Sequence, residues 1–449
     1  MTGGTFSFHF ADRPHRARTA DGIWLSSKDF TGREPRILRI AEPARVPPVW
    51  AQDLLRVARV VHLVDRRAPR ATAPDGWTRH LTVTIELIDP QPWQDNLDLL
   101  ATLLSTLTAD RWQLQVTGGA TPYSRQLPLF AGWSAFQVAL FSGGLDSLAY
   151  AADRAHSGVD GLLLVAQYDV NKRQQQRRYE AIRRIRPTVQ LRQYWHQPQP
   201  SSRRPDQRKQ PQEPSTRSRG LVFVAAAVYA AAAHGLPEVV IPENGQLAVN
   251  PPLLADRVAA CSSRSVHPRT LHLVNQLIHQ ISGAGSPVTV FNPLAGLTKT
   301  GVCRLALDAG LRPDDLADAE SCGHPPARRG NRPPHCGCCL PCLVRRSALW
   351  TVLDGDDPTR YEADPWQPSA TDAQRADLAA LLHWLSTDFT ARDLAADLPL
   401  PAGTSIPAVL DVINRARTDL ITYLGTVIPT RSRLLGFSST LTPSARNRV

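Results

Sequence analysis

The stretch QVALFSGGLDSLAYAADRAH, from Gln137 to His156, reads as an apolar strand, a short loop with two adjacent glycines, and a helix. Gly143 and Gly144 leave room for a ligand to approach the main chain closely. The helix that begins near Ser147 adds free backbone N–H groups and the positive end of its dipole. Because a phosphate chain needs several donors that converge, the stretch predicts a phosphate-binding loop between the strand and the helix.

Polar side chains of the loop suit the same ligand. Ser142 and Ser147 can donate hydroxyl hydrogens, and we interpret Asp146 as a solvent-facing carboxylate that orients the loop or holds Mg²⁺ on the phosphates. No Gly-Lys-Ser/Thr sequence closes the loop, so γ-phosphate transfer of the Walker type is not expected. The alternative is a tight turn without a ligand, but the strand before it and the helix after it favour the phosphate site.

Strands and helices alternate after Gln137, and this pattern predicts an α/β fold with a parallel sheet that helices cover on both faces. In such a sheet the substrate lies at the carboxyl ends of the strands. The expected strands are 137–141, 161–167, 188–195, 238–243 and 287–293.

The length of 449 residues predicts more than one domain. Residues 1–130 are expected to form an α+β domain, with a strand at 81–88 and a returning strand in RWQLQVTG. Residues 131–349 are expected to form the domain that contains the loop, and residues 350–449 a helical region. An insert at about 197–219 is rich in Pro, Gln, Arg and Ser, and we expect it to be disordered because it has little apolar surface to bury.

The composition indicates a soluble cytoplasmic protein. No apolar run approaches the roughly 18 residues that span a bilayer, and the first residues lack the apolar core of a secretory signal. The formal net charge of +11 suits anionic partners such as nucleotides, but almost all of the positive charge is arginine and is consistent with a solvated basic face. Nucleic acid therefore stays an alternative partner that the charge permits and does not favour.

A cluster of cysteines near residue 340 predicts a zinc site, because the chain has no secretory signal that would favour disulfides. Three of the cysteines follow C-x2-C-x2-C spacing, from which thiolates can converge on one metal ion, and a fourth precedes them. The expected ligands are Cys322, Cys336, Cys339 and Cys342. Cys338 is interpreted as a spare thiol, with His324 and His335 as substitute ligands.

SGGLDS between a strand and a helix resembles the PP-loop of the ATP pyrophosphatase superfamily, whose members cleave ATP to AMP and pyrophosphate. Together with a single Cys followed by CGCCLPC, it resembles the 7-cyano-7-deazaguanine synthase family. That family uses ATP to convert 7-carboxy-7-deazaguanine to an amide and then a nitrile, and it holds a zinc ion with four cysteines. The resemblance covers about residues 138–345 and implies ATP, Mg²⁺ and Zn²⁺ as cofactors.

The resemblance also implies roles for single residues. NPLAGLTKTGV resembles the family's Pro-Leu…Leu-x-Lys segment, so Lys299 is expected to contact phosphate or adenylate, and RSRGLVFVAAAVYAAAAHG resembles its Arg-led apolar helix. The residues expected to bind the nucleotide are Ser142, Gly143, Gly144, Leu145, Asp146, Ser147 and Arg219. The residues expected to take part in catalysis are Asp146, Ser147 and Lys299.

Two segments depart from the family's pattern. AQYDVNKRQ only loosely matches its Asp-Tyr-Gly-Gln motif, and VIPENGQLAVNPPL replaces the usual stretch after the fourth strand. Because both segments follow strands, the acceptor chemistry can differ. Glu243, Asn244 and Asn250 either hydrogen-bond a purine-like edge or cap a turn.

The N-terminal segment is similar to that of enlarged members of this family from bacterial anti-phage defence systems. The resemblance implies a ligase that adenylates 7-carboxy-7-deazaguanine, releases pyrophosphate, and passes the acyl group to ammonia or to an amine of a partner protein. One alternative is a tRNA-modifying PP-loop enzyme that carries sulfur on Cys303 or Cys261. A non-catalytic nucleotide-binding scaffold is a third interpretation, which the intact loop and Lys299 disfavour.

Overall fold

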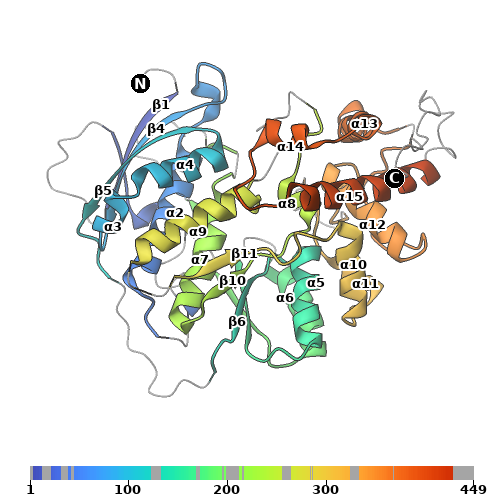
Figure 1. The fold of residues 1–449 in the computed structure, drawn as a ribbon, viewed down its shortest axis with the longest axis horizontal. Helices are drawn as coiled ribbons and strands as arrows, with labels where there is room; N and C mark the ends of the chain where they lie inside the picture. Colours follow the sequence, from blue (N-terminus) through green and yellow to red (C-terminus); the bar gives the residue numbers. More distant parts are fainter. Residues whose placement is uncertain are drawn as a thin grey trace.

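Two parallel sheets organise the chain in the computed structural model (Figure 1). A 4-stranded sheet lies in the N-terminal region and a 5-stranded sheet lies at the centre. The predicted α/β class with parallel strands is confirmed for the part of the chain that the structure describes. That part consists of residues 4–12, 22–31, 39–41, 45–122, 133–167, 172–194, 197–198, 212–214, 217–254, 264–283, 285, 287–323, 333–367 and 369–427.

The N-terminal region is built from parallel strands, and the α+β arrangement expected for it is wrong. β1 (Thr5–Phe10) lies between β2 (Ile23–Leu25) and β4 (His80–Leu87), and it pairs in parallel with both. The strand predicted to return, RWQLQVTG, is β5 (Arg111–Gly118) and runs in the same direction as β4. The reason is the helix between them, α4 (Leu97–Thr108), which carries the chain back over the sheet before β5 starts.

The central sheet is doubly wound. From its first strand in the middle, the chain adds two strands on one side and then crosses over to add two on the other, in the order β11-β10-β6-β7-β8. β6 and β10 are therefore neighbours whose connections leave in opposite directions, which is the point where an open α/β sheet places its ligand. The five strands are β6 (Gln137–Leu140), β7 (Leu162–Gln167), β8 (Gln190–Tyr194), β10 (Glu238–Val240) and β11 (Thr289–Phe291).

Helices cover both faces of the central sheet, as Figure 1 shows. On one face α7 and α9 pack toward the N-terminal region, and on the other α5, α6 and α10 form a separate apolar layer. α7 is apolar around most of its circumference because it lies between the sheet and α2 (Val49–Arg67). The helices that cover the sheet are α5 (Leu145–His156), α6 (Lys172–Ile185), α7 (Arg219–His234), α9 (Pro268–Ser282) and α10 (Lys299–Asp308).

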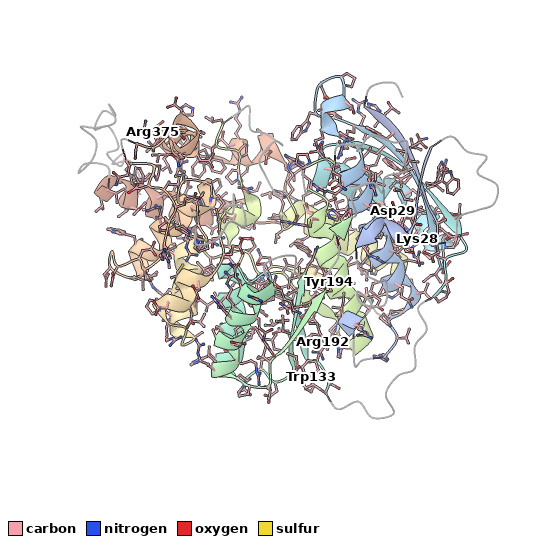
Figure 2. All side chains as sticks on the ribbon, turned by 180° about the vertical axis from the view of Figure 1, so that it is seen from behind. Lys28, Asp29, Trp133, Arg192, Tyr194 and Arg375 are labelled. Atoms are coloured by element: carbon pink, nitrogen blue, oxygen red, sulfur yellow. The ribbon has the colours of Figure 1, made fainter. Side chains whose placement is uncertain are left out.

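One continuous apolar cluster joins the N-terminal region to the central sheet. It contains buried side chains of β1, β4 and α2 on one side and of α7, α9, β6 and β11 on the other. In the view from behind, side chains fill the space between the two regions, and Tyr194 at the end of β8 belongs to this cluster (Figure 2). The two regions therefore share a core, and the boundary predicted near residue 130 stays a prediction.

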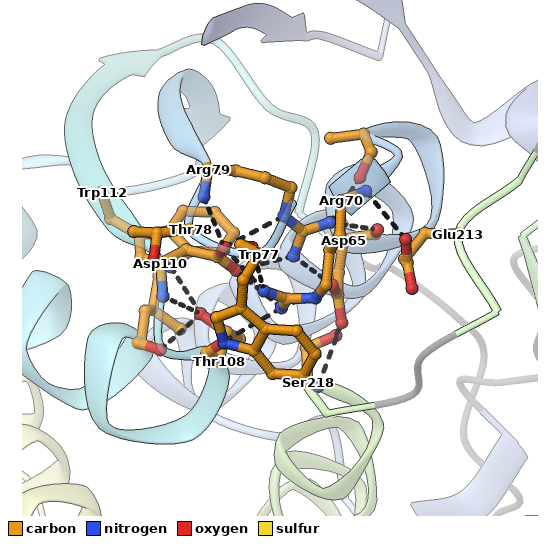
Figure 3. Close-up of polar contacts among 12 residues, drawn as sticks. Asp65, Arg70, Trp77, Thr78, Arg79, Thr108, Asp110, Trp112, Glu213 and Ser218 are labelled. Carbon is orange, nitrogen blue, oxygen red and sulfur yellow. Dashed lines mark hydrogen bonds and ion pairs between the residues drawn. The ribbon is translucent and has the colours of Figure 1, made fainter. Parts of the chain in front are cut away.

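Buried arginines and aspartates tie the start of α7 to the N-terminal region (Figure 3). Arg79 is fully buried, and its Nη2 lies 2.6 Å from a carboxylate oxygen of both Asp65 and Asp110. Arg70 donates to both carboxylate oxygens of Asp110. Ser218, directly before α7, donates its hydroxyl to Asp65 at 2.6 Å. Two cations and two anions thus compensate one another in the interior.

The described ends of the insert predicted at 197–219 are ordered, so the expected disorder is wrong for them. Gln197–Pro198 form β9, which pairs antiparallel with β3 (Phe30–Thr31). Glu213 is buried and accepts a hydrogen bond from the backbone N–H of Arg70 at 2.9 Å. Most of the residues between these ends lie outside the described part of the chain. Both ends contact the N-terminal region, because its strands and its arginine segment supply the hydrogen-bond partners that the polar insert does not supply to itself.

Helices continue to residue 427. Four of them, α12 (Leu340–Val352), α13 (Asp372–Ser386), α14 (Ala391–Asp397) and α15 (Ile406–Val427), pack with α8 (Gly245–Val249) around a third apolar cluster. Within the described ranges, none of the helices combines the length and the apolar character that a membrane crossing requires. The remaining short elements are η1 (Ser27–Asp29), η2 (Arg39–Ala41), η3 (Arg70–Thr72), α3 (Gln91–Gln94) and α11 (Pro313–Asp318).

Candidate functional site

The predicted phosphate loop lies between β6 and α5, at the switch point of the central sheet. Gly143 has a φ of +78°, in the left-handed region that glycine adopts without strain. The Gly144 N–H donates to Ser142 Oγ at 3.0 Å, and Ser147 Oγ donates to the Gly144 carbonyl at 3.0 Å. α5 begins at Leu145 without a side-chain cap, so its first backbone N–H groups are available to a ligand.

Asp146 is buried, and the solvent-facing position expected for it is wrong. It lies on the first turn of α5 and is 7% exposed. Its Oδ2 accepts hydrogen bonds from Lys299 Nζ at 2.6 Å and from Asn244 Nδ2 at 3.2 Å, and Asn244 also donates to Glu243 Oε1 at 3.0 Å. The cause is the topology: the segments after β6, β10 and β11 meet at one edge of the sheet and cover the carboxylate.

The charges of this cluster depend on one another. Burial alone would raise the pKa of Asp146, but the Lys299 ammonium and the hydrogen bonds to the carboxylate outweigh it and lower the pKa. Burial alone would lower the pKa of Lys299, but Asp146 and Glu243 outweigh it and raise the pKa. Burial and the charge of Asp146 raise the pKa of Glu243 well above its ordinary value. The Asp146–Lys299 pair is therefore ionised at neutral pH, whereas Glu243 keeps its proton to a higher pH than an ordinary glutamate.

The Asp146 carboxylate also forms a side-chain hydrogen bond with Glu243. Its Oδ1 is buried and accepts no hydrogen bond from an N–H or hydroxyl donor of the described residues, so the Glu243 carboxyl or a ligand is the partner left for it. Carboxylate oxygens are donors that Mg²⁺ takes at nucleotide sites. Asp146 therefore fits a cation that accompanies a phosphate ligand, although Lys299 already neutralises the other oxygen.

Of the two roles that the sequence left open for the asparagines after β10, the structure shows the turn cap, and the contact with a purine-like edge stays a prediction. Asn244 Oδ1 accepts from the Leu247 N–H at 3.1 Å and caps α8, while its Nδ2 faces Asp146. Asn250 ends the same helix with a φ of +46°, a conformation that asparagine tolerates better than most residues. Turn capping is thus observed for Asn244, and the same residue also reaches the candidate site.

Asn292 is a site residue that the sequence analysis did not single out. Its Oδ1 accepts from the Glu243 N–H at 3.1 Å, and its Nδ2 donates to the Glu243 carbonyl at 2.7 Å. These two bonds fix the backbone of Glu243 at the sheet edge. The available signal was an asparagine directly after the last strand of the sheet, because β11 ends one residue before it.

Arg219, predicted to bind the nucleotide, is the first residue of α7 and is exposed. Its guanidinium lies 5.5 Å from the ring centroid of Phe223, one helical turn further along. Ser218 beside it is held by Asp65 of the N-terminal region. A role for Arg219 at the loop stays a prediction.

The four predicted zinc ligands come together. The Sγ atoms of the group all lie within 4.8 Å of one another, as one metal ion requires, and the group consists of Cys322, Cys336, Cys339 and Cys342. Cys338 is buried outside this group, and the Nε2 of His335 lies 3.1 Å from the Ala319 carbonyl. His324 lies outside the described residues. Four thiolates in this arrangement fit a closed, structural zinc site.

The cysteine cluster is linked to the phosphate loop through the main chain. Glu320, two residues before Cys322, forms a parallel bridge with Gly144, and its N–H donates to the Gly143 carbonyl at 3.4 Å. A Cβ at Gly144 would lie 2.9 Å from the Glu320 carbonyl oxygen, so a side chain there would push the two segments apart. The second glycine of the loop therefore also serves contact with the segment that leads into the cysteines.

Two thiols are the candidates for the sulfur carrier in the alternative function, and one of them, Cys303, lies in the described part of the chain. Cys303 is fully buried in the apolar layer of α10, and burial raises its pKa to about 12. Such a thiol is a poor nucleophile at neutral pH. Cys261 lies outside the described residues.

Comparison of the chain with protein-family models, with curated proteins and with solved structures gives no match. The features that bear on its function are the loop, the Asp146 cluster and the cysteine cluster. All three lie on or beside the carboxyl edge of the central sheet.

Proposed function

We propose that the chain is an ATP-dependent ligase of the PP-loop ATP pyrophosphatase type. The observation that carries the proposal is the convergence of the glycine loop, the uncapped start of α5 and the Asp146–Lys299 pair at the switch point of a doubly wound sheet. This arrangement suits a phosphate chain accompanied by a cation, because it offers backbone donors, a buried ammonium and a buried carboxylate.

The proposed substrate is 7-carboxy-7-deazaguanine, on the resemblance of SGGLDS, the Lys299 segment and the cysteine spacing to the family that uses it. A carboxylate oxygen of the substrate attacks the α-phosphorus of ATP, and the bond to the pyrophosphate breaks. An amine then attacks the acyl carbon, loses a proton and releases AMP. The amine is ammonia, which gives an amide on the way to a nitrile, or an amine of a partner protein, as in the defence systems.

The chain's own residues neutralise and position the reactants in this scheme. Backbone N–H groups of the first turn of α5 bind the phosphates, with the hydroxyls of Ser142 and Ser147 beside them. Asp146 would hold Mg²⁺, which neutralises the leaving pyrophosphate when bound. Lys299 keeps Asp146 ionised, and Asn244 and Asn292 fix the position of Glu243. The four cysteines would hold Zn²⁺ as a structural ion.

Product analysis tests this function. The protein is incubated with ATP, Mg²⁺ and 7-carboxy-7-deazaguanine, with ammonia or with the products of neighbouring genes, and nucleotides and intact protein masses are measured. We expect AMP and pyrophosphate in equal amounts, and no AMP from Asp146→Asn. Asp153→Asn, on the same helix but paired with its neighbour Arg154 at the surface, is the matched control and should retain turnover. ADP as the product, or no turnover with any acceptor, would refute the proposal.

A further inference from the structure

Arg178 is a buried cation beside the phosphate loop. It lies on the inner face of α6, with a side chain that is 4% exposed. Its Nε donates to the Asp318 carbonyl at 3.0 Å, and Nη2 donates to the same oxygen. Nη1 makes no hydrogen bond to any described residue, and its distance to Glu320 Oε2 is 3.9 Å, too long for one. Part of the guanidinium is thus held in place and part is left without an acceptor.

The free end of this guanidinium lies against Gly143. A Cβ at Gly143 would be 3.1 Å from Arg178 Nη1 and 3.2 Å from Gln175 Cγ. Gln175, one turn earlier on the same face of α6, donates to the Ser142 carbonyl at 3.3 Å. α6 therefore contacts the loop from the side with two polar residues, one of which bonds the main chain while the other keeps a donor unused.

The charge of Arg178 is retained at neutral pH. Burial lowers its pKa, but only to about 10. Glu320 at 3.9 Å compensates part of this charge without a hydrogen bond, and a buried donor without an acceptor is costly. An anion bound at the loop would neutralise the charge and accept the unused N–H. A phosphate chain is such an anion, and the adjacent backbone is already arranged for it.

We propose that Arg178 is a phosphate-binding residue of this site, whose Nη1 donates to the β- or γ-phosphate of the nucleotide and to released pyrophosphate. The inference rests on the proposed function, because it needs a nucleotide at the loop. It adds to that function a cation from α6, which follows β7, whereas Lys299 follows β11 on the other side of β6. Arg178 thereby also joins the loop to Asp318, at the end of α11 and just before the cysteine segment.

Calorimetric titration with pyrophosphate, ATP and AMP, each with Mg²⁺, tests the inference on the full chain. Arg178→Gln should weaken the affinity for pyrophosphate and for ATP about ten- to hundred-fold, as expected for the loss of a charged hydrogen bond. The affinity for AMP should stay unchanged. Arg178→Lys keeps the charge but not the fork geometry of the guanidinium, so its affinity for pyrophosphate and ATP should lie between those of the wild type and of Arg178→Gln. Arg184→Gln, on the same helix and paired with Asp315 at the surface, is the matched control and should bind like the wild type.

The outcomes separate the inference from the function on which it rests. A wild-type chain that binds neither ATP nor pyrophosphate would refute the nucleotide site, and the role of Arg178 with it. A wild type that binds both, with an unchanged affinity in Arg178→Gln, would refute the role of Arg178 alone. Equal weakening of AMP and pyrophosphate together with a lower melting temperature would assign Arg178 to the support of α11 only, and would also overturn the inference.

Discussion

At the scale of single residues, the Asp146–Lys299 pair links the stability of the chain to its proposed chemistry. Both side chains are buried, and each keeps the other ionised. A buried pair of this kind adds little net stability, but removal of one partner leaves the other charge without compensation. The same carboxylate lies at the proposed phosphate site, so the residue that the proposed function needs is also one that the fold depends on.

Asp146→Ala is therefore expected to lower the free energy of unfolding by about 3–5 kcal/mol, because it leaves the Lys299 ammonium buried alone. Urea unfolding followed by circular dichroism measures the change. Asp146→Ala combined with Lys299→Met should regain part of the loss, since neither charge then remains. Asp153→Ala, at a half-exposed position of the same helix, is the control. A loss below about 1 kcal/mol in Asp146→Ala would contradict the buried ion pair.

Glu243 gives the same cluster a pH dependence. Its pKa in the folded protein is raised above the ordinary value of 4.5, so its contribution to stability is present below that pH and is lost as the pH rises through the raised pKa. Glu243→Gln should remove this loss, so the difference in the free energy of unfolding between variant and wild type should grow as the pH rises above the ordinary value of 4.5. Unfolding midpoints without nucleotide or Mg²⁺ measure it, with Glu238→Gln, exposed at the start of β10, as the control. A constant difference over this range would contradict the raised pKa.

At the scale of elements, the segment before the cysteines supports the phosphate loop. Glu320 bridges Gly144, and the four thiols that follow could hold a metal ion. α6 contacts the loop from another side through Gln175. The conformation of a glycine loop, which has little preference of its own, is thus set by the elements packed around it.

Cys336→Ser is expected to lose zinc, whereas Cys338→Ser should keep one zinc per chain because Cys338 lies outside the ligand group. Metal analysis of the purified variants measures this. Loss of zinc should also release the Glu320 segment, so hydrogen exchange should accelerate in peptides that cover residues 142–147. Equal zinc loss in both variants would contradict the ligand set. Unchanged exchange in zinc-free protein would contradict the link to the loop.

At the scale of the whole molecule, the N-terminal region and the central sheet share one apolar core. α7 is apolar on the face toward α2 as well as on the face toward the sheet, and Ser218 at its start is bonded to Asp65. Both described ends of the insert also rest on the N-terminal region. Under the proposed function, additions of this size favour a partner protein as the acceptor, since a small nucleophile such as ammonia needs only a narrow opening.

A chain that begins at residue 133 is consequently expected to be insoluble, because it would expose the apolar surfaces of α7 and α9. Size-exclusion chromatography and circular dichroism after expression test this. A soluble, monomeric and folded chain from residue 133 would show that the shared core is dispensable.

Ser218→Ala in the full chain is a milder change and should lower the free energy of unfolding by about 1–3 kcal/mol, since Asp65 loses a hydrogen bond in the interior.

The sequence by itself determined the features that depend on local patterns. Apolar runs between helices predicted the strands of the central sheet, and the spacing of the cysteines predicted the four thiols that converge, because both are set by residues close together in the chain. Adjacent glycines between a strand and a helix predicted the position of the loop for the same reason. The direction of β5 was predicted wrongly, because the direction of a strand depends on the path of the connection before it.

Only the tertiary structure decided which side chains meet at the loop. Asp146 is buried because segments about 100 and 150 residues away in the chain, with Asn244 and Lys299, close over it, and no local pattern encodes that approach. Arg178 shares a helix face with Tyr179 and Ile182, so its burial had a signal in the sequence, but its contact with Gly143 did not. The physical reason is that periodicity fixes which face of an element is buried, whereas the order of strands in the sheet fixes what that face meets.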